Sequence, residues 1–158
     1  MLAIRASNFT MTAGAETRIA NGDLTYATPD SRRTDLTGTS LSYAITSAGG
    51  GRTYTMRNYH QATSFDSGYL SIGVEAAIES SNQRLGGAAS YRVSTPTATL
   101  VLNVQDFTGG SLRVAAANSS LVVTVTGTNT FRLEVDADGD GTVDATIPAT
   151  LQELRALI

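Results

Sequence analysis

The sequence predicts a single all-β domain over residues 1–158, either an antiparallel β-sandwich or a partly open barrel of about nine or ten strands, with a short C-terminal helix. Apolar and polar residues alternate through most of the chain, as expected for strands with one covered face. Ser and Thr supply 38 of the 158 residues, and Thr, Val, Ile and Tyr suit pleated surfaces. Turn-forming residues recur at short intervals between the alternating runs, which favours antiparallel neighbours.

The N-terminal half begins with residues 1–12, for which the sequence predicts a weak strand or an extended arm. Asn21 and Gly22 then supply the two φ > 0 positions of a type I′ turn, so a hairpin is expected around them. Residues 40–46 alternate cleanly and are followed by three glycines and a second run at 52–59, which predicts another hairpin.

Residues 69–80 carry the strongest alternation in the chain and predict a long strand. The chain is expected to return alongside it until Pro96 interrupts the hydrogen-bonded ladder. Further strands follow in a meander, with one turn predicted at Gly109 and Gly110. These strands are expected at residues 98–104, 111–116, 121–126, 131–136 and 143–147.

A short helix is predicted for residues 150–158. Thr150 and Glu153 have the spacing of a capping box, in which each side chain bonds the backbone N–H of the other residue. Leu151, Leu154 and Leu157 recur at three-residue intervals and form one apolar stripe. This stripe is expected to dock on the sheet, because so short a helix does not persist undocked.

Composition and charge exclude several classes of partner. The eleven basic residues are all Arg, the chain has 14 acidic residues, and the net charge is −3. No basic run with interleaved aromatic residues suggests nucleic acid, and no apolar stretch is long enough for a membrane-spanning helix. Cysteine is absent from the sequence, which excludes disulfides and thiolate metal sites.

An acidic stretch between the last two predicted strands carries the only clear chemical signal. Its spacing matches the first nine positions of the EF-hand loop, including Gly141 at the sixth position where the chain bends. Ile147 stands where that loop has a bidentate Glu, and strands rather than helices flank the stretch. The predicted ligands of a structural Ca²⁺ ion are Asp136, Asp138, Asp140, Thr142 through its carbonyl, and Asp144.

This acidic stretch resembles the calcium loops of thrombospondin type 3 repeats, dockerins and integrin propellers. The resemblance implies a bound cation but no shared fold. Without the twelfth-position carboxylate the affinity should be weak, with a dissociation constant on the order of 10⁻⁴ to 10⁻³ M. The alternative interpretation is that Asp and Gly here simply form a soluble turn.

Three segments, residues 85–96, 131–141 and 150–154, carry a second resemblance. They resemble segments of an uncharacterised group of bacterial exported proteins, often classed as lipoproteins, that are rich in β-structure and end in a VRLEVDxDGDG segment. The resemblance implies secretion without naming an activity.

These observations predict a non-enzymatic domain that is extracellular, at the cell surface or periplasmic, and that binds calcium structurally. Two other roles remain open. A self-assembling surface or filament subunit would bind other protein subunits by strand addition, through residues 3–12 or an open sheet edge. A carbohydrate-binding module would bind glycans through exposed tyrosines such as Tyr59 and Tyr69. His60, the only histidine, is expected to be a polar residue at a strand end.

Overall fold

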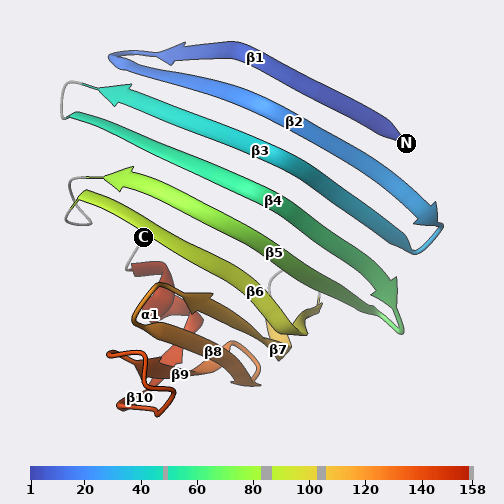
Figure 1. The fold of residues 1–158 in the computed structure, drawn as a ribbon. Helices are drawn as coiled ribbons and strands as arrows, with labels where there is room; N and C mark the ends of the chain where they lie inside the picture. The colour runs from blue at the N-terminus through green and yellow to red at the C-terminus, as the bar shows by residue number, and fades with distance from the viewer. Residues whose placement is uncertain (48–49, 83–86, 103–105, 157–158) are drawn as a thin grey trace.

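A computed structural model describes residues 1–47, 50–82, 87–102 and 106–156. Within these residues ten strands form one sheet in chain order, and every neighbouring pair is antiparallel (Figure 1). The strands are β1 (Leu2–Ala13), β2 (Glu16–Asp30), β3 (Arg33–Ser47), β4 (Gly50–Asp66), β5 (Tyr69–Asn82), β6 (Gly87–Leu102), β7 (Asp106–Ala115), β8 (Ser120–Gly127), β9 (Thr130–Asp136) and β10 (Ala145–Thr150).

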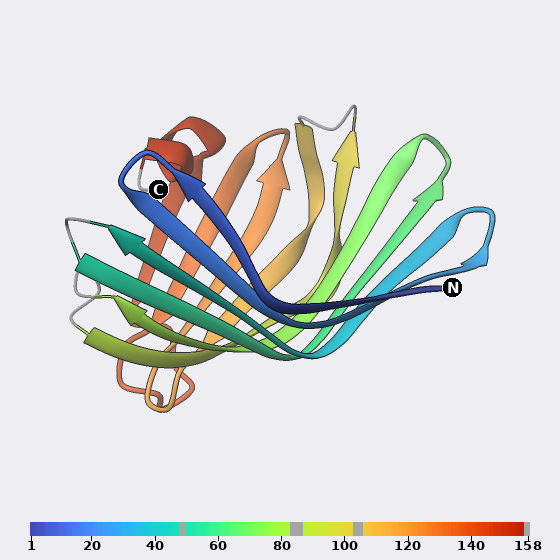
Figure 2. The same cartoon turned by 90° about the horizontal axis from the view of Figure 1, so that it is seen from above.

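The all-β class and the short C-terminal helix are confirmed. The strands make one open layer, which differs from the two packed sheets of a sandwich and is nearer to the predicted alternative, a partly open barrel. Figure 2 shows the sheet from above as a curved trough. The segment predicted as a strand or an arm, residues 1–12, corresponds to β1, which pairs with β2 as an edge strand. Meander topology places each strand beside its chain neighbours only, so β1 and β10 are the two edges.

β-Bulges near the middle of the long strands bend the sheet. Register shifts occur in five neighbouring strand pairs: β1 with β2, β2 with β3, β4 with β5, β5 with β6, and β6 with β7. A bulge adds a residue to one strand, bends it and increases its twist. Because the bulges lie side by side across the sheet, the strands bend together and produce the trough.

The hairpin predicted at Asn21 and Gly22 is wrong, because both residues lie inside β2. The side chain of Asn21 accepts the N–H of Asn8 on β1 at 2.5 Å, so it bonds across the sheet instead of forming a turn. Gly22 has φ 145°, and a side chain there would overlap the backbone O of Ser40 on β3. The chain therefore uses this Asn-Gly pair for close strand approach at the bend.

Two other predicted interruptions are also continuous strand. β6 runs through Pro96, where a bulge in the pairing with β7 removes the need for an N–H donor. Gly109 and Gly110 lie within β7, and Gly110 has φ 100° directly beside the backbone of Ala98. Gly and Pro lie at bulges here, so residues that usually indicate a turn are found within continuous strands.

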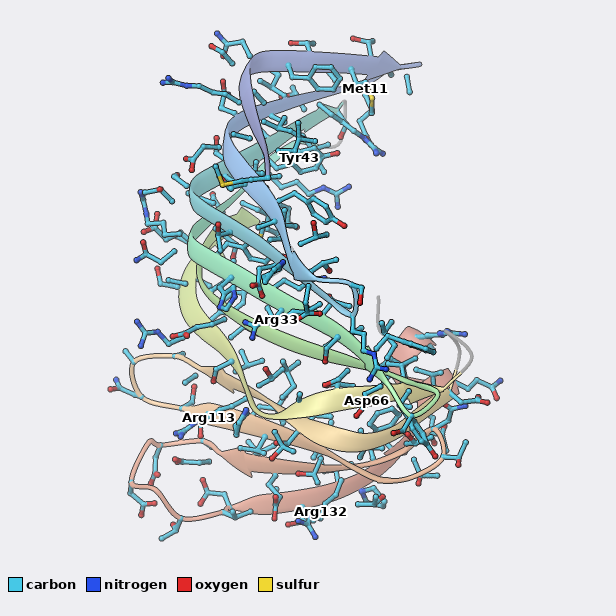
Figure 3. All side chains as sticks on the ribbon, turned by 90° about the vertical axis from the view of Figure 1, so that its right-hand side faces the viewer. Met11, Arg33, Tyr43, Asp66, Arg113 and Arg132 are labelled. Atoms are coloured by element: carbon cyan, nitrogen blue, oxygen red, sulfur yellow. The ribbon has the colours of Figure 1, made fainter. Side chains whose placement is uncertain are left out.

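Apolar side chains gather on the concave side of the trough. Figure 3 shows Met11 and Tyr43 on one side of the ribbon and Arg113 on the other. Few of these side chains are deeply covered: among the described residues the buried hydrophobic ones are Ala76, Val101 and Phe131. Phe131 meets the ring of Phe107 edge to face at 5.8 Å between centroids. The small core therefore lies over β5 to β9.

The C-terminal helix α1 (Leu151–Ala156) begins as predicted. The N–H of Thr150 donates to Oε2 of Glu153 at 2.7 Å, and the N–H of Glu153 donates to Oγ1 of Thr150 at 3.3 Å. This reciprocal pair is the predicted capping box. Leu151 and Leu154 are half-buried, whereas Leu157 and the Leu85 and Gly86 portion of the exported-protein resemblance lie outside the described residues.

Candidate functional site

The acidic loop connects β9 to β10, and Asp136 anchors it. Asp136 is the last residue of β9, pairs in register with Ser120 of β8, and is only 9% exposed. Its Oδ1 accepts the N–H of Gly139 at 2.7 Å and its Oδ2 accepts the N–H of Gly141 at 3.2 Å. One carboxylate thus curls the loop around itself.

The far end of the loop closes onto the same point. Oδ2 of Asp144 accepts the N–H of Ala137 at 2.7 Å, and the N–H of Asp144 donates to the carbonyl of Val135 at 2.8 Å. Gly139 and Gly141 have φ values of 78° and 88°, which glycine adopts without strain. Gly141, at the predicted bend, and Gly139 therefore let the chain turn, and Asp144 returns beside Asp136.

Three of the predicted ligands converge. Carboxylate oxygens of Asp136, Asp138 and Asp144 lie within 4.8 Å of one another. Carboxylates this close repel one another, and a cation between them would replace that repulsion with attraction. Carboxylate oxygens are the ligands that Ca²⁺ prefers, and the ion takes 6–8 oxygens in total. Three side chains would supply part of that shell.

The other two predicted ligands, Asp140 and Thr142, contact each other. Oδ1 of Asp140 accepts both the hydroxyl of Thr142 at 2.6 Å and its N–H at 2.7 Å. The hydroxyl bond, followed by the backbone bond, holds the pKa of the Asp140 carboxyl below its ordinary value. Asp140 is therefore stabilised as a carboxylate but lies outside the converging group.

A second feature, an apolar hollow on the concave side, was not predicted as a site. It has a volume of about 420 Å³, a size that small apolar ligands can fill. The alternating pattern predicted apolar residues on one side of these strands but did not predict whether a second sheet covers them. The hollow is lined by Ala20, Leu41, Ser42, Tyr43, Tyr54, Met56, Ile78 and Tyr91.

The tyrosines considered for glycan binding do not lie opposite each other. Tyr59 pairs in register with Gly38, and its hydroxyl donates to Oε1 of Gln61 at 2.6 Å. Burial raises the pKa of the Tyr59 hydroxyl. Tyr69 begins β5 opposite Asp66 and is 39% exposed.

The polar residues weighed for other chemistry lie on open sheet surface. Nε2 of His60 lies 3.6 Å from Oδ1 of Asp35, and the His60 side chain is 46% exposed. Glu79 accepts hydrogen bonds from Nε and Nη2 of Arg57 at 3.0 and 3.2 Å. This bidentate pair joins β4 to β5 at the surface.

Comparison of the chain with protein-family models, curated proteins and solved structures finds no match. Among the described residues, no helix has both the length and the hydropathy needed to cross a lipid bilayer.

Proposed function

We propose that this chain is a non-enzymatic exported or cell-surface β-domain whose acidic loop binds Ca²⁺ structurally. The observation that carries the proposal is the convergence of three carboxylates, from Asp136, Asp138 and Asp144, within one nine-residue loop. Glycines and backbone hydrogen bonds hold the loop in a curled conformation, so little ordering is required on binding.

The ion would act on the last hairpin. It would lie where β9 turns into β10, and β10 is the outermost strand of the sheet at this end. Opening β10 would separate Asp144 from Asp136, so an ion bound to both would oppose that opening. α1 follows directly after β10, which links the metal to the position of the helix.

An extracellular setting fits this chemistry. A loop lacking the bidentate twelfth ligand is expected to need calcium at roughly 10⁻⁴ to 10⁻³ M, the range of extracellular modules. The hydroxyl-rich composition and the resemblance to exported proteins support the same location. Binding rather than catalysis is favoured because the only histidine lies on an exposed strand surface.

The test is a thermal melt in excess EGTA and in a few millimolar Ca²⁺. A ligand that binds only the folded state stabilises it by RT ln(1 + [L]/Kd), about 1 to 2 kcal/mol for a Kd near 10⁻⁴ M, which raises the midpoint by a few degrees. The combined change Asp138→Asn and Asp144→Asn keeps hydrogen-bond acceptors but removes two charges, and should abolish the rise.

Asp66→Asn is the matched control, since it removes an exposed carboxylate from the β4–β5 end. It should respond to calcium like the parent chain. A parent midpoint that is unchanged by calcium would show that the loop is only a polar turn. An equal response in the double variant would place the ion elsewhere.

A further inference from the structure

The outer edge of β1 is an unprotected strand edge. β1 pairs with β2 on one side, and no described strand of the chain lies on its other side. It is 12 residues long, contains a single charged residue, Arg5, and has no proline. Proteins usually protect such edges with charge, proline or brevity, because a row of unpaired N–H and C=O groups recruits another strand.

The apolar side chains of β1 are also exposed, and they share the concave side. Leu2 is 57% exposed, Ile4 52%, Phe9 60% and Met11 52%. A bulge between Ala6 and Phe9 adds one residue to β1, so Phe9 and Met11 remain on the same side as Leu2 and Ile4. The edge therefore offers backbone hydrogen bonds and apolar surface together.

The other edge of the sheet is protected. β10 has six residues, its Pro148 has no N–H to donate, and Thr150 leads directly into α1. A proline on an edge strand and a short strand both disfavour pairing with a further strand. Head-to-tail addition, with β1 of one copy on β10 of the next, would join a long open edge to a blocked one.

We propose that β1 pairs with β1 of a second copy, antiparallel, about a two-fold axis at Ser7 and Asn8. The strand is self-complementary in this register. In both copies the bulge places its extra β1 residue at the axis. The two bulges therefore face each other, and the two β1 strands pair along their length without a further register shift. On the concave side the pairing sets Leu2 against Ala13, Ile4 against Met11 and Ala6 against Phe9; on the convex side it sets Ala3 against Thr12 and Arg5 against Thr10.

This register keeps like charges apart and leaves the bulge bonded within its own chain. Each Arg5 lies opposite a threonine rather than the other Arg5. The N–H of Asn8, at the axis, already donates to Asn21 of the same chain. Such an isologous contact closes at two copies, whereas a head-to-tail contact would continue into a filament.

The accessible surface area of the chain is large enough to accommodate a second copy. Its accessible surface is 10159 Å², whereas a folded monomer of 16.5 kDa is expected to expose about 7,600 Å². A standard interface buries roughly 800 Å² on each partner, so the excess exceeds what a stable dimer covers. The hollow of about 420 Å³ is lined by residues of β2 to β6 and by none of β1, so a ligand there would leave the β1 edge unpaired. A second copy is therefore the occupant that we assign to the edge.

The experiment is sedimentation equilibrium of the full chain over a range of micromolar concentrations, with two double variants. The change Ile4→Lys with Met11→Lys sets Lys opposite Lys in the proposed register, while Ile4→Lys with Met11→Glu sets Lys opposite Glu. Residues 4 and 11 lie about 23 Å apart along a strand, so the two charges cannot pair within one copy. Each dimer has two such cross-strand pairs, so the first variant should bind about tenfold or more weakly than the second.

The parent chain should give twice 16.5 kDa and no larger species, with or without EGTA, because the acidic loop lies at the opposite edge. Thr146→Lys on β10 should leave the dimer unchanged. Equal dissociation of the two double variants would overturn the register. A parent that is monomeric throughout, or one that forms larger species abolished by Thr146→Lys, would overturn the proposal.

Discussion

Gly110 tests whether close approach of β6 and β7 creates the bend. Replacing it with Ala forces φ 100° on a residue with a side chain and places the new methyl group against the backbone of Ala98 and Thr99. The unfavourable φ costs about 1 to 3 kcal/mol. Overlap with backbone atoms that cannot rotate away adds about 1 to 3 kcal/mol.

Gly87→Ala is the matched control. Gly87 has φ 116°, but a side chain there would meet nothing within 4 Å. This variant therefore carries the backbone cost without the overlap. Because each kcal/mol shifts the midpoint of a chain of this length by about 2 to 4 °C, Gly110→Ala should melt several degrees below Gly87→Ala.

Urea unfolding followed by circular dichroism would measure both free energies. Equal losses for the two variants would refute the close approach at Gly110. A neutral Gly110→Ala would refute the strained backbone as well, and the bend would then need another cause.

Two further perturbations test local bonding. Oγ1 of Thr95 accepts the N–H of Val74 at 2.8 Å at the β5–β6 bulge, so Thr95→Val should cost about 1 to 2 kcal/mol and speed hydrogen exchange at Val74, whereas exposed Thr97→Val should do neither. Thr142→Val should raise the pKa of the Asp140 carboxyl toward its ordinary value, as followed by carboxyl NMR, because the hydroxyl bond is the main cause of the lowering. Because this bond lowers the folded-state pKa of Asp140, the stability that it contributes is present above the unfolded-state pKa and is lost as the pH falls through the folded-state pKa. Below about pH 4 the variant should therefore lose less stability than the parent. An unchanged titration of Asp140 in the variant would contradict the assigned bond.

Local patterns in the sequence predicted the elements that local physics determines. The capping box of Thr150 and Glu153 formed as expected, because its bonds involve residues only three apart. The alternation in residues 69–80 predicted β5 for the same reason. In the acidic loop, the spacing of Asp136, Asp138 and Asp144 was enough to predict that they converge.

The number of layers could not be predicted in this way. Alternating strands have the same pattern whether a second sheet covers the apolar side or the side remains open. The misassigned turns have a related cause. Gly22 and Gly110 leave room for the backbone of a neighbouring strand, and that strand is distant in the sequence. The pairing of Asp140 with Thr142 was also missed, since the EF-hand template treats both as ligands.

The meander order has a consequence for how the chain unfolds. Each strand depends only on its immediate neighbours, so stability along the sheet should add up step by step, as it does in repeat arrays. Opening β1 breaks one ladder and leaves nine strands paired, whereas opening β8 breaks two ladders. Unfolding is therefore expected to begin at the ends and to depart from a single all-or-none transition.

The two ends should differ in this respect. Phe107 and Phe131 lie near the C-terminal end, where the sheet curls over its small core. At the β1 end, the side chains of Leu2, Ile4, Phe9 and Met11 are exposed in a lone copy. Hydrogen exchange should therefore rise from β7–β9 toward β1 in dilute solution, and the gradient should flatten at concentrations where two copies share that edge.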